Sequence, residues 1–288
     1  MTPSYRPSLP PLKTVIVRHR LSSKRSLGQH FLLDKNLINR IVGEVDCGHD
    51  QYIFEIGPGP GGLTRALLTL EAKKIIAIER DQRCIEALRE LQNIYPAKLE
   101  LVHGDALKVD MGSFLPQGEK GIIVSNLPYN IATPLLINWL RTMANIKSMV
   151  LMFQKEVADR IVGISGTHSY GRLSVLCQWL CETKKLFDIS PNAFTPPPKV
   201  RSTLVQLTPK SCRFTQTEFS AVEAVTAAAF GQRRKMLRSS LKQLTPKPND
   251  MLAEANIPPE KRAEELSVAE FFKLAKIHQR TLVNCSES

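Results

Sequence analysis

Four residues at positions 126–129 carry the most specific chemistry in this sequence. Asn126, Leu127, Pro128 and Tyr129 follow the short apolar run 122–124. The asparagine offers a side-chain carbonyl, the proline fixes a turn that exposes backbone carbonyls, and the tyrosine ring offers a flat stacking face. These groups would together hold an amino group attached to an aromatic ring. The tetrapeptide therefore predicts a pocket for an aromatic amine, although an ordinary strand that runs into a proline turn would give the same letters.

A glycine-rich segment, 57–62, predicts a nucleotide-like ligand. It follows an apolar run and opens a helical pattern, so that backbone amides can approach a ligand closely. Gly57, Gly59 and Gly62 fit the spacing of a dinucleotide-binding turn, and the glycines alone do not separate a nicotinamide cofactor from S-adenosylmethionine. Glu79 ends the next apolar run, where a carboxylate would accept hydrogen bonds from both ribose hydroxyls of either cofactor.

Asp105 follows a third apolar run, within Gly104-Asp105-Ala106. An aspartate at that position would bind the exocyclic amine of the adenine of the cofactor. Candidate ligand groups thus follow successive apolar runs of the sequence. If those runs are parallel strands, their carboxyl ends meet at the edge of the sheet where such sheets bind ligands.

The pattern that positions these residues alternates short apolar runs with helical segments. The expected strands are 52–56, 74–78, 99–102, 122–124 and 148–152, and the expected helices between them are 62–71, 82–92 and 133–144. This alternation predicts an α/β fold with an open, mostly parallel sheet that is covered on both faces. Two further runs, 184–189 and 202–207, are expected to pair as an antiparallel edge, with the prolines confined to their connection.

After Pro209 the strand pattern stops and a small all-helical region is expected. Its predicted helices are 217–230, 233–244, 249–255, 259–266 and 268–279. The predicted organisation is a basic N-terminal arm at 1–24, a catalytic domain at 25–209 and a helical RNA-binding domain at 210–288.

The composition favours a polyanionic partner. The 288 residues carry a net charge of +12 and a pI near 9.5, which points to nucleic acid rather than to a small neutral substrate. No acidic residue precedes Asp34, and the prolines at positions 3, 7, 10 and 11 argue against an early helix. The arm fits either an organellar transit peptide or a tail that touches RNA. No apolar run is long enough to cross a bilayer.

The six cysteines show neither a CxxC pair nor the spacing of a disulfide framework, which indicates reduced thiols inside a cell. Cys177 and Cys181 are expected to share a helical face. A metal site there would need two further ligands that nothing nearby supplies, so buried packing is the prediction and no metal is expected.

An ordered set of motifs resembles the ribosomal RNA adenine dimethyltransferases, a family with bacterial small-subunit, eukaryotic and mitochondrial members. The motifs are 26–32, 55–64, 78–81, 104–106, 126–129, 153–160, 196–200 and 230–235. The resemblance implies a Rossmann-like methyltransferase with S-adenosylmethionine at His30, Leu32, Gly57, Gly59, Glu79, Asp105 and Asn126. Relatives usually carry asparagine where this chain has His30, whose imidazole can still donate one hydrogen bond to the cofactor.

The chemistry that this family performs needs an activated aromatic amine. We expect the side-chain oxygen of Asn126 and a backbone carbonyl at Leu127 or Pro128 to accept both amine hydrogens. Tyr129 and Phe153 are expected to sandwich an adenine that has left its RNA stack. Phe153 fits equally well as a core residue that ends a buried strand.

Basic residues are concentrated between Glu223 and Asp250, where the sequence has no acidic residue. On the expected helix 233–244, every fourth residue in one series is basic, so one face would be positive and could follow a phosphate backbone. Such a run is ordinarily only a solvated face, but the resemblance at 230–235 favours RNA binding. The candidate RNA-binding residues are Arg233, Arg234, Lys235, Arg238 and Lys242.

The resemblance implies dimethylation of two adjacent adenosines near the 3′ end of small-subunit ribosomal RNA. The expected substrate is an assembling 30S particle in the cytoplasm, or in a mitochondrion if the arm is a transit peptide, and a monomer is expected. The alternatives are a large-subunit resistance methylase, a non-catalytic assembly or transcription factor on the same fold, and a nicotinamide dehydrogenase. The last would leave Asn126 and Tyr129 without a task.

Overall fold

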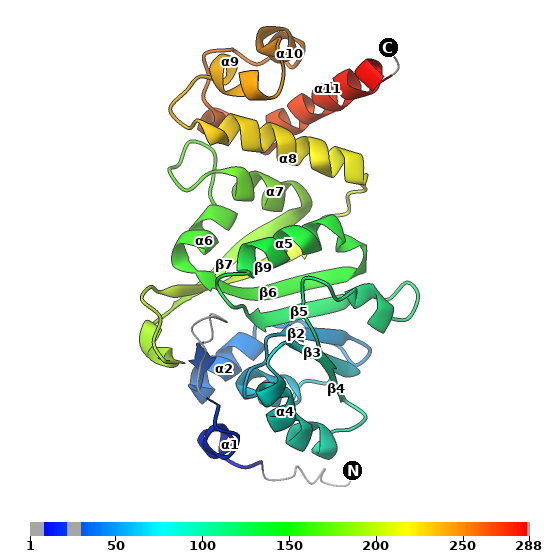
Figure 1. The fold of residues 1–288 in the computed structure, drawn as a ribbon, viewed down its shortest axis with the longest axis vertical. Coiled ribbons are helices and arrows are strands. Elements are labelled where there is room, and N and C mark those ends of the chain that lie inside the picture. Colours follow the sequence, from blue (N-terminus) through cyan, green and yellow to red (C-terminus); the bar gives the residue numbers. More distant parts are fainter. Residues whose placement is uncertain (1–8, 22–29, 287–288) are drawn as a thin grey trace. The chain divides into compact units, whose positions relative to one another are not determined.

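The computed structural model describes residues 9–21 and 30–286, without the side chains of 282–286. Within these residues, seven strands form one sheet in the order β4-β3-β2-β5-β6-β9-β7 (Figure 1). The strands are β2 (Tyr52–Ile56), β3 (Lys74–Glu79), β4 (Leu99–His103), β5 (Gly121–Asn126), β6 (Ile146–Gln154), β7 (Cys181–Ile189) and β9 (Ser202–Pro209). The pairs from β4 to β6 are all parallel. The expected mostly parallel α/β fold is confirmed, and β7 and β9 are neighbours at one edge, as expected.

The strand order reverses direction between β2 and β5. β2 pairs with β3 on one side and with β5 on the other, in parallel register. The connections therefore leave the two strands on opposite faces of the sheet, which opens a crevice beyond their carboxyl ends. All five residues of β2 are buried, because helices cover both faces of a parallel sheet.

Helices α2 (Lys35–Val42), α3 (Gly62–Leu67), α4 (Gln82–Ile94) and α5 (Ala132–Arg141) belong to the same part of the chain. Asp34 and Asp81 cap α2 and α4 by accepting backbone hydrogen bonds in the first turn. The buried side chains of these helices form a core with the strands, in which Leu67 and Ile75 are fully buried. Short strands β1 (Phe31–Leu32) and β8 (Phe194–Thr195) pair antiparallel beside the main sheet.

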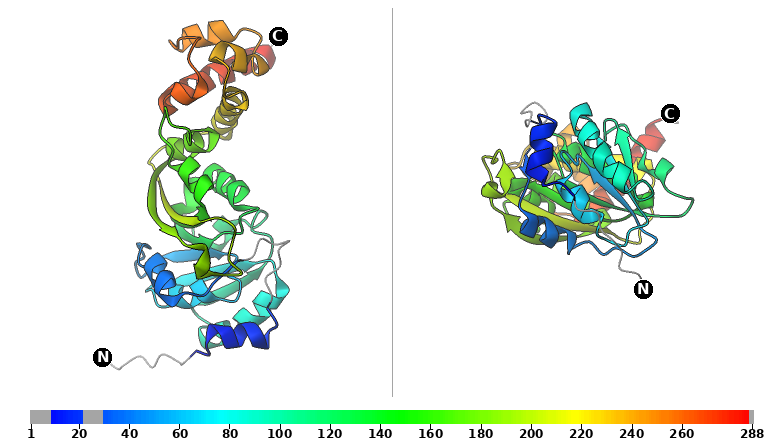
Figure 2. Two further views of the ribbon diagram at one scale, coloured as in Figure 1. Left: turned by 90° about the vertical axis from the view of Figure 1, so that its left-hand side faces the viewer. Right: turned by 90° about the horizontal axis from the view of Figure 1, so that it is seen from below.

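A helix near the N-terminus, α1 (Leu12–Arg18), contradicts the expectation that the early prolines would prevent one. The expectation was wrong because Pro10 and Pro11 precede the first helical turn, where no intrahelical N–H donor is needed. Val15 of α1 is buried, and α1 lies beside α4 (Figure 2). The remaining residues of the expected arm, 1–8 and 22–24, lie outside the described part of the chain.

The chain folds into two compact units, which do not coincide with the expected domains. One unit comprises the residues up to 138 together with 142–155 and 186–206. The other comprises 139–141, 156–185 and the described residues from 207 onwards, so that α7 (Arg172–Leu180) and all but the first residue of α6 (Lys155–Ile161) are grouped with the C-terminal helices. The catalytic and RNA-binding roles assigned to 25–209 and 210–288 stay predictions.

The C-terminal helices are α8 (Gln216–Gly231), α9 (Leu237–Ser240), α10 (Pro248–Glu254) and α11 (Val268–Ser286). The expected helix 233–244 is confirmed only from Leu237 to Gln243, as α9 and a following 3₁₀ turn, because the chain turns after α8 and Met236 forms an antiparallel bridge with Arg262. The Leu237 N–H donates to the Lys261 carbonyl, 2.8 Å away. The expected helix 259–266 is reduced to a 3₁₀ turn at Ala263–Glu265, since this tertiary pairing overrides local helix propensity.

The two central cysteines do not share a helical face. Cys177 lies in α7, which ends at Leu180, and Cys181 begins β7. Both are buried, and burial raises the pKa of the Cys177 thiol and that of the Cys181 thiol, the latter to about 12. Among the described residues, no cluster of His, Cys, Asp or Glu is arranged to hold a metal ion. The described helices include none with the length and apolar character of a membrane span.

Candidate active site

A cleft opens at the carboxyl ends of β2 and β5, where the strand order predicts a ligand. The space within it, open solvent included, is about 950 Å³. We call it the ligand cleft. Its lining residues are His30, Phe31, Leu32, Glu55, Gly57, Pro58, Gly59, Pro60, Leu63, Glu79, Arg80, Asn126, Leu127, Pro128, Tyr129, Asn130 and Ile131. The structure therefore brings together the glycine-rich segment, Glu79 and the tetrapeptide, as the sequence predicts.

The glycine-rich turn is shaped by backbone conformations and close contacts that disfavour a side chain. Gly57 has φ +67°, and a Cβ atom on it would stand 3.5 Å from the ring of Pro128. Gly59 has φ +55°, and a Cβ there would stand 3.3 Å from the ring of Phe31. Other residues rarely adopt such φ angles. The glycine-rich turn thus lies against the tetrapeptide at Gly57 and against β1 at Gly59.

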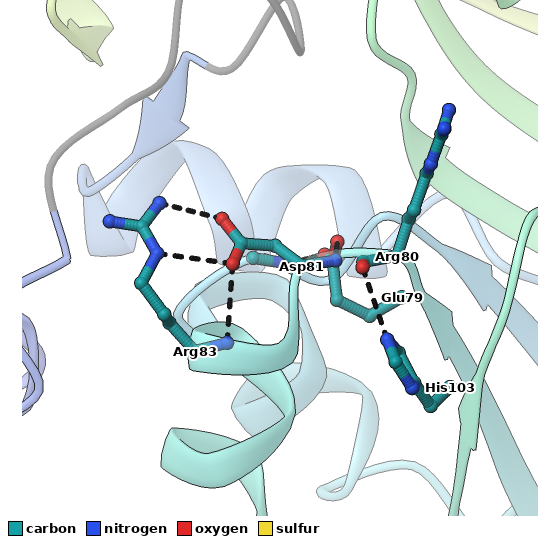
Figure 3. Close-up of polar contacts among 6 residues, drawn as sticks. Glu79, Arg80, Asp81, Arg83 and His103 are labelled. Carbon is teal, nitrogen blue, oxygen red and sulfur yellow. Dashed lines mark hydrogen bonds and ion pairs between the residues drawn. The ribbon is translucent and has the colours of Figure 1, made fainter.

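Glu79 holds the turn from the neighbouring strand. One carboxylate oxygen accepts the N–H of Gly59 at 3.0 Å, and the other accepts the N–H of Asp81 at 2.8 Å. Burial raises the pKa of Glu79, against the lowering effect of these backbone hydrogen bonds. Arg83 grips the side chain of Asp81 through two nitrogens, at 3.1 and 2.7 Å (Figure 3). Glu79 is thereby fixed at the strand end, on the wall of the ligand cleft.

Glu55 is a residue of the ligand cleft that the sequence analysis did not single out. Its side chain is 1% exposed, and its Oε2 atom has no hydrogen-bond partner among the described residues. Burial raises its pKa to about 8, and the Thr64 hydroxyl beside it acts in the opposite direction. A carboxyl inside the otherwise apolar run 52–56 was the available signal, since such a group is costly to bury without a purpose.

The side-chain amide of Asn126 uses its nitrogen in a hydrogen bond, whereas its oxygen has no partner among the described residues. Its Nδ2 donates to the backbone carbonyl of His30 at 3.1 Å. Its Oδ1 has no partner among the described residues, so it is available as an acceptor. Leu127 is buried and Pro128 packs on Gly57, which leaves the chain direction after Asn126 well defined.

His30 and Tyr129 form one wall of the ligand cleft. Their ring centroids are 5.6 Å apart, at an interplanar angle of 31°. The Tyr129 hydroxyl hydrogen-bonds to Ser202 Oγ at 2.5 Å, and burial raises the Tyr129 pKa. His30 Nδ1 lies 2.8 Å from the carbonyl of Pro196 and donates to it, because a carbonyl only accepts. The hydrogen bond at Nδ1 thus fixes the imidazole of His30, and Nε2 is the ring nitrogen that a ligand could contact.

Two predicted residues are not among those that line the ligand cleft. Phe153 is fully buried in β6, which agrees with the core alternative and leaves no exposed ring face for stacking in this conformation. Asp105 lies just beyond β4, where its Oδ1 accepts the N–H of Leu107 at 3.1 Å. Its other oxygen is 3.9 Å from Arg80, so Asp105 borders the ligand cleft through that side chain.

The residues of the ligand cleft fit an adenosine-containing cation. Glu79 places a carboxylate at the strand end where ribose hydroxyls are bound in such folds. Glu55 offers a buried oxygen that lacks a donor, which a cationic or N–H-bearing ligand would satisfy. Leu32 and Leu63 add apolar surface for a flat ring. S-adenosylmethionine has each of these complementary groups.

The basic residues after α8 divide into two kinds. Arg233 donates to the carbonyls of His168 at 2.8 Å and Tyr170 at 3.0 Å, so its guanidinium stabilises the protein itself. Arg238 is 3.9 Å from Glu260. Arg234, Lys235 and Lys242 are exposed and have no partner among the described residues. The expected helical stripe of Arg234, Arg238 and Lys242 is wrong, because the turn before α9 breaks the helix.

Comparisons with known proteins agree with this arrangement. A sequence model of the family described as ribosomal RNA adenine dimethylase matches residues 20–280. The chain is 54% identical to ribosomal RNA small subunit methyltransferase A of Rhizobium johnstonii, over 93% of this chain and 97% of the relative. It is 51% identical to the protein of that name from Rhodospirillum rubrum, over 93% and 92%. The crystal structure of a dimethyladenosine transferase from Plasmodium falciparum superimposes with a TM-score of 0.73, at 29% identity over 85% of this chain and 96% of that one.

Proposed function

The chain belongs to the ribosomal RNA adenine dimethylase family, and on that premise we propose that it dimethylates adenosines of small-subunit ribosomal RNA. The methyl donor is S-adenosylmethionine. The acceptors are the exocyclic amines of two adjacent adenosines near the 3′ end of the RNA. The relatives named above carry the small-subunit activity in their names, which favours this substrate over large-subunit RNA.

The free Oδ1 of Asn126 carries the proposal. Because Nδ2 is tied to the His30 carbonyl, the amide cannot rotate without losing that bond, and Oδ1 stays an acceptor on a residue that lines the ligand cleft. An aromatic amine is a weak nucleophile, since its lone pair is shared with the ring. Oδ1 and a backbone carbonyl at Leu127 or Pro128 accept its two hydrogens and hold the nitrogen pyramidal. They stabilise the positive charge that develops there, so that no strong base is needed.

Tyr129 presents its ring to the target adenine. Its hydroxyl is anchored to Ser202 and its ring lies beside His30, so the stacking face is held before the base arrives. Stacking on an aromatic side chain is worth about 1–3 kcal/mol per base. A second stacking face from Phe153 requires that its ring become exposed when the RNA binds.

The cofactor lies along the glycine-rich turn. When bound, S-adenosylmethionine supplies an activated methyl group. Glu79 accepts hydrogen bonds from its ribose, His30 and Leu32 border it, and Asp105 receives its adenine amine at the rim beside Arg80. Glu55 supplies a buried oxygen to its cationic portion.

The RNA partner is bound through the exposed cations Arg234, Lys235 and Lys242, with Arg238 beside them. Arg234, Lys235 and Lys242 have no side-chain partner among the described residues, which leaves them available for phosphates. The substrate is an assembling 30S particle in the cytoplasm, on which the enzyme acts as a monomer. Net charge and an exposed cationic cluster support an RNA partner.

The experiment is to incubate undermethylated small subunits with the protein and isotopically labelled S-adenosylmethionine. Modified nucleosides are then mapped by mass spectrometry. We expect two adjacent dimethyladenosines near the 3′ end of the small-subunit RNA. Product on large-subunit RNA only would identify a resistance methylase. Bound RNA without any methyl transfer would identify a non-catalytic factor.

A further inference from the structure

Residues 9–21 pack against α3 and Phe31, beside the glycine-rich turn, and we refer to them as the N-terminal strap. The family match begins at residue 20, so α1 precedes the matched region. At the sequence level this segment is only a basic, proline-containing arm. In the structure it is an anchored element beside the glycine-rich turn.

The strap touches the turn directly. Gly62 begins α3, and a Cβ on it would stand 2.8 Å from the carbonyl of Leu32 and 3.1 Å from the side chain of Leu12. The space beside Gly62 is therefore filled by α1 and by β1. Arg65, one turn further along α3, donates to the carbonyl of Pro10. The strap thus contacts α3 at its first residue, Gly62, and again one turn later, at Arg65.

The strap also supports Phe31 from behind. Val15 and Leu21 are buried in one cluster with Phe31, Cys84 and Ala87. Phe31 lines the ligand cleft and lies against Gly59. Phe31 is thus packed against α1 and also lines the ligand cleft. Because protein interiors are close-packed, a shift of the strap would move Phe31 and change the shape of the ligand cleft.

Polar contacts fix the far end of α1. Arg18 and His19 both bind Glu90 of α4, at 2.9 and 2.7 Å. Both hydrogen bonds lower the pKa of Glu90, His19 more than Arg18, so Glu90 is held as a carboxylate at neutral pH. The strap is thereby attached to α3, β1 and α4, which are the elements that surround the turn.

We propose that the N-terminal strap is a positioning element of the cofactor site, which holds Phe31 and the glycine-rich turn in their binding geometry. Only the identity of the ligand rests on the proposed function. The strap itself touches no reacting group, so its contribution lies in cofactor affinity and leaves the chemical step unchanged. This assignment replaces both a cleavable targeting segment and an RNA-binding tail as the role of residues 9–21.

The test compares Val15→Ala with Val17→Ala in the full-length chain. Val15 is 2% exposed and Val17, on the same helix, is 76% exposed, so the same substitution removes packing at one position only. We expect Val15→Ala to raise the KM for S-adenosylmethionine about tenfold, which corresponds to about 1.4 kcal/mol, with kcat at saturation nearly unchanged. Val17→Ala should resemble the wild type.

Hydrogen exchange on the ligand-free protein decides the proposal independently of the activity. In Val15→Ala the amides of the four glycines within 57–62 should exchange faster, while those of β6 keep their wild-type rates. Equal protection of 57–62 in all three proteins, or equal acceleration in β6, would overturn the proposal. If Val15→Ala does not fold, Leu12→Ala makes the same test at the contact with Gly62. A wild-type protein that fails to bind S-adenosylmethionine refutes the proposed function, and the exchange result still decides the role of the strap.

Discussion

In the ligand cleft, Glu79 and Asn126 are each tied to backbone groups of another segment, whereas Arg234 and Lys235 stand in solvent with no partner in the described chain. In the ligand cleft, Glu55 and Glu79 are buried, and Glu79 and Asn126 are held by hydrogen bonds of defined length. The basic residues after α8 need only to be exposed and close together, because attraction to a phosphate backbone is long-ranged and tolerant of geometry.

This difference between the ligand cleft and the basic residues after α8 indicates how sensitive each is to a single substitution. Removing one atom group from the ligand cleft leaves a neighbour unpaired or a ligand misplaced, which is costly in a low dielectric. Removing one cation from an exposed cluster only reduces the total electrostatic attraction to the phosphate backbone. Arg233 shows that the two kinds of residue can be adjacent in sequence, since it is an internal donor among solvent-exposed cations.

The largest expected effect is that of Asn126→Ala. Loss of Oδ1 removes an acceptor that acts on developing charge, which by analogy with an oxyanion-hole donor costs about 3–4 kcal/mol, or roughly a hundredfold to a thousandfold in kcat. Single-turnover methyl transfer at saturating cofactor measures it. Asn130→Ala is the matched control, because Asn130 lines the same cleft but is exposed. Turnover close to wild type in Asn126→Ala would remove the proposed role.

Glu55→Gln tests the buried carboxyl. Its pKa in the folded protein is about 8, above the ordinary 4.5, so the stability that it contributes is complete below pH 4.5 and is lost as the pH rises to about 8. An amide cannot ionise, so the variant should be more stable than the wild type at pH 7, by about 3 kcal/mol at most. Urea unfolding at pH 5, 7 and 9 measures the difference.

Glu90→Gln is the control of opposite sign for that experiment. Hydrogen bonds from His19 and Arg18 hold the Glu90 pKa below its ordinary value, so its stabilising contribution is present at neutral pH and is lost on acidification. Glu90→Gln should therefore be less stable than the wild type at pH 7. A Glu55→Gln protein with the pH profile of the wild type would show that Glu55 is ionised throughout.

Combined alanine substitution of Arg234, Lys235 and Lys242 should weaken RNA binding without affecting the fold. If each contacts one phosphate, the slope of log affinity against log salt becomes shallower by about 2–3. Filter binding to small-subunit RNA across a salt series measures it. Arg233→Ala is the contrasting variant, expected to lower the free energy of unfolding by about 1–3 kcal/mol, because two carbonyls lose their donor. The comparison fails if Arg233→Ala alone produces the change in slope.

The smallest effect is expected from His30→Asn. An asparagine can still donate to the Pro196 carbonyl, but the ring contact with Tyr129 is lost, and such contacts are worth about 0.5–1.5 kcal/mol. The KM for the RNA substrate should rise several-fold, with cofactor affinity changing less. A loss of activity beyond a hundredfold would show that His30 takes a direct part in the reaction.

Most of the parallel sheet was predictable, and so were Glu79 and Asn126 of the ligand cleft, whereas Glu55 was not singled out. The run 52–56 forms β2 with the predicted ends, because a strand that is buried on both faces is nearly all apolar, here with Glu55 as the exception. Glu79 and Asn126 end strands, as predicted, and therefore meet at one edge of the sheet. The turn at 233–236 was not predictable, since these residues favour a helix locally and the bridge between Met236 and Arg262 delays the helix until Leu237.

The sequence by itself determined which chemical groups are present and in what order along the strands they occur, and hence the family and the fold. The tertiary structure alone decided which groups meet: the Asn126 amide with the His30 carbonyl, Glu79 with the Gly59 amide, and α1 with Gly62. It also decided which cations stay free and that Phe153 is buried. Local patterns encode propensity and burial, whereas contacts between distant segments depend on strand order, register and packing, which arise only when the whole chain folds.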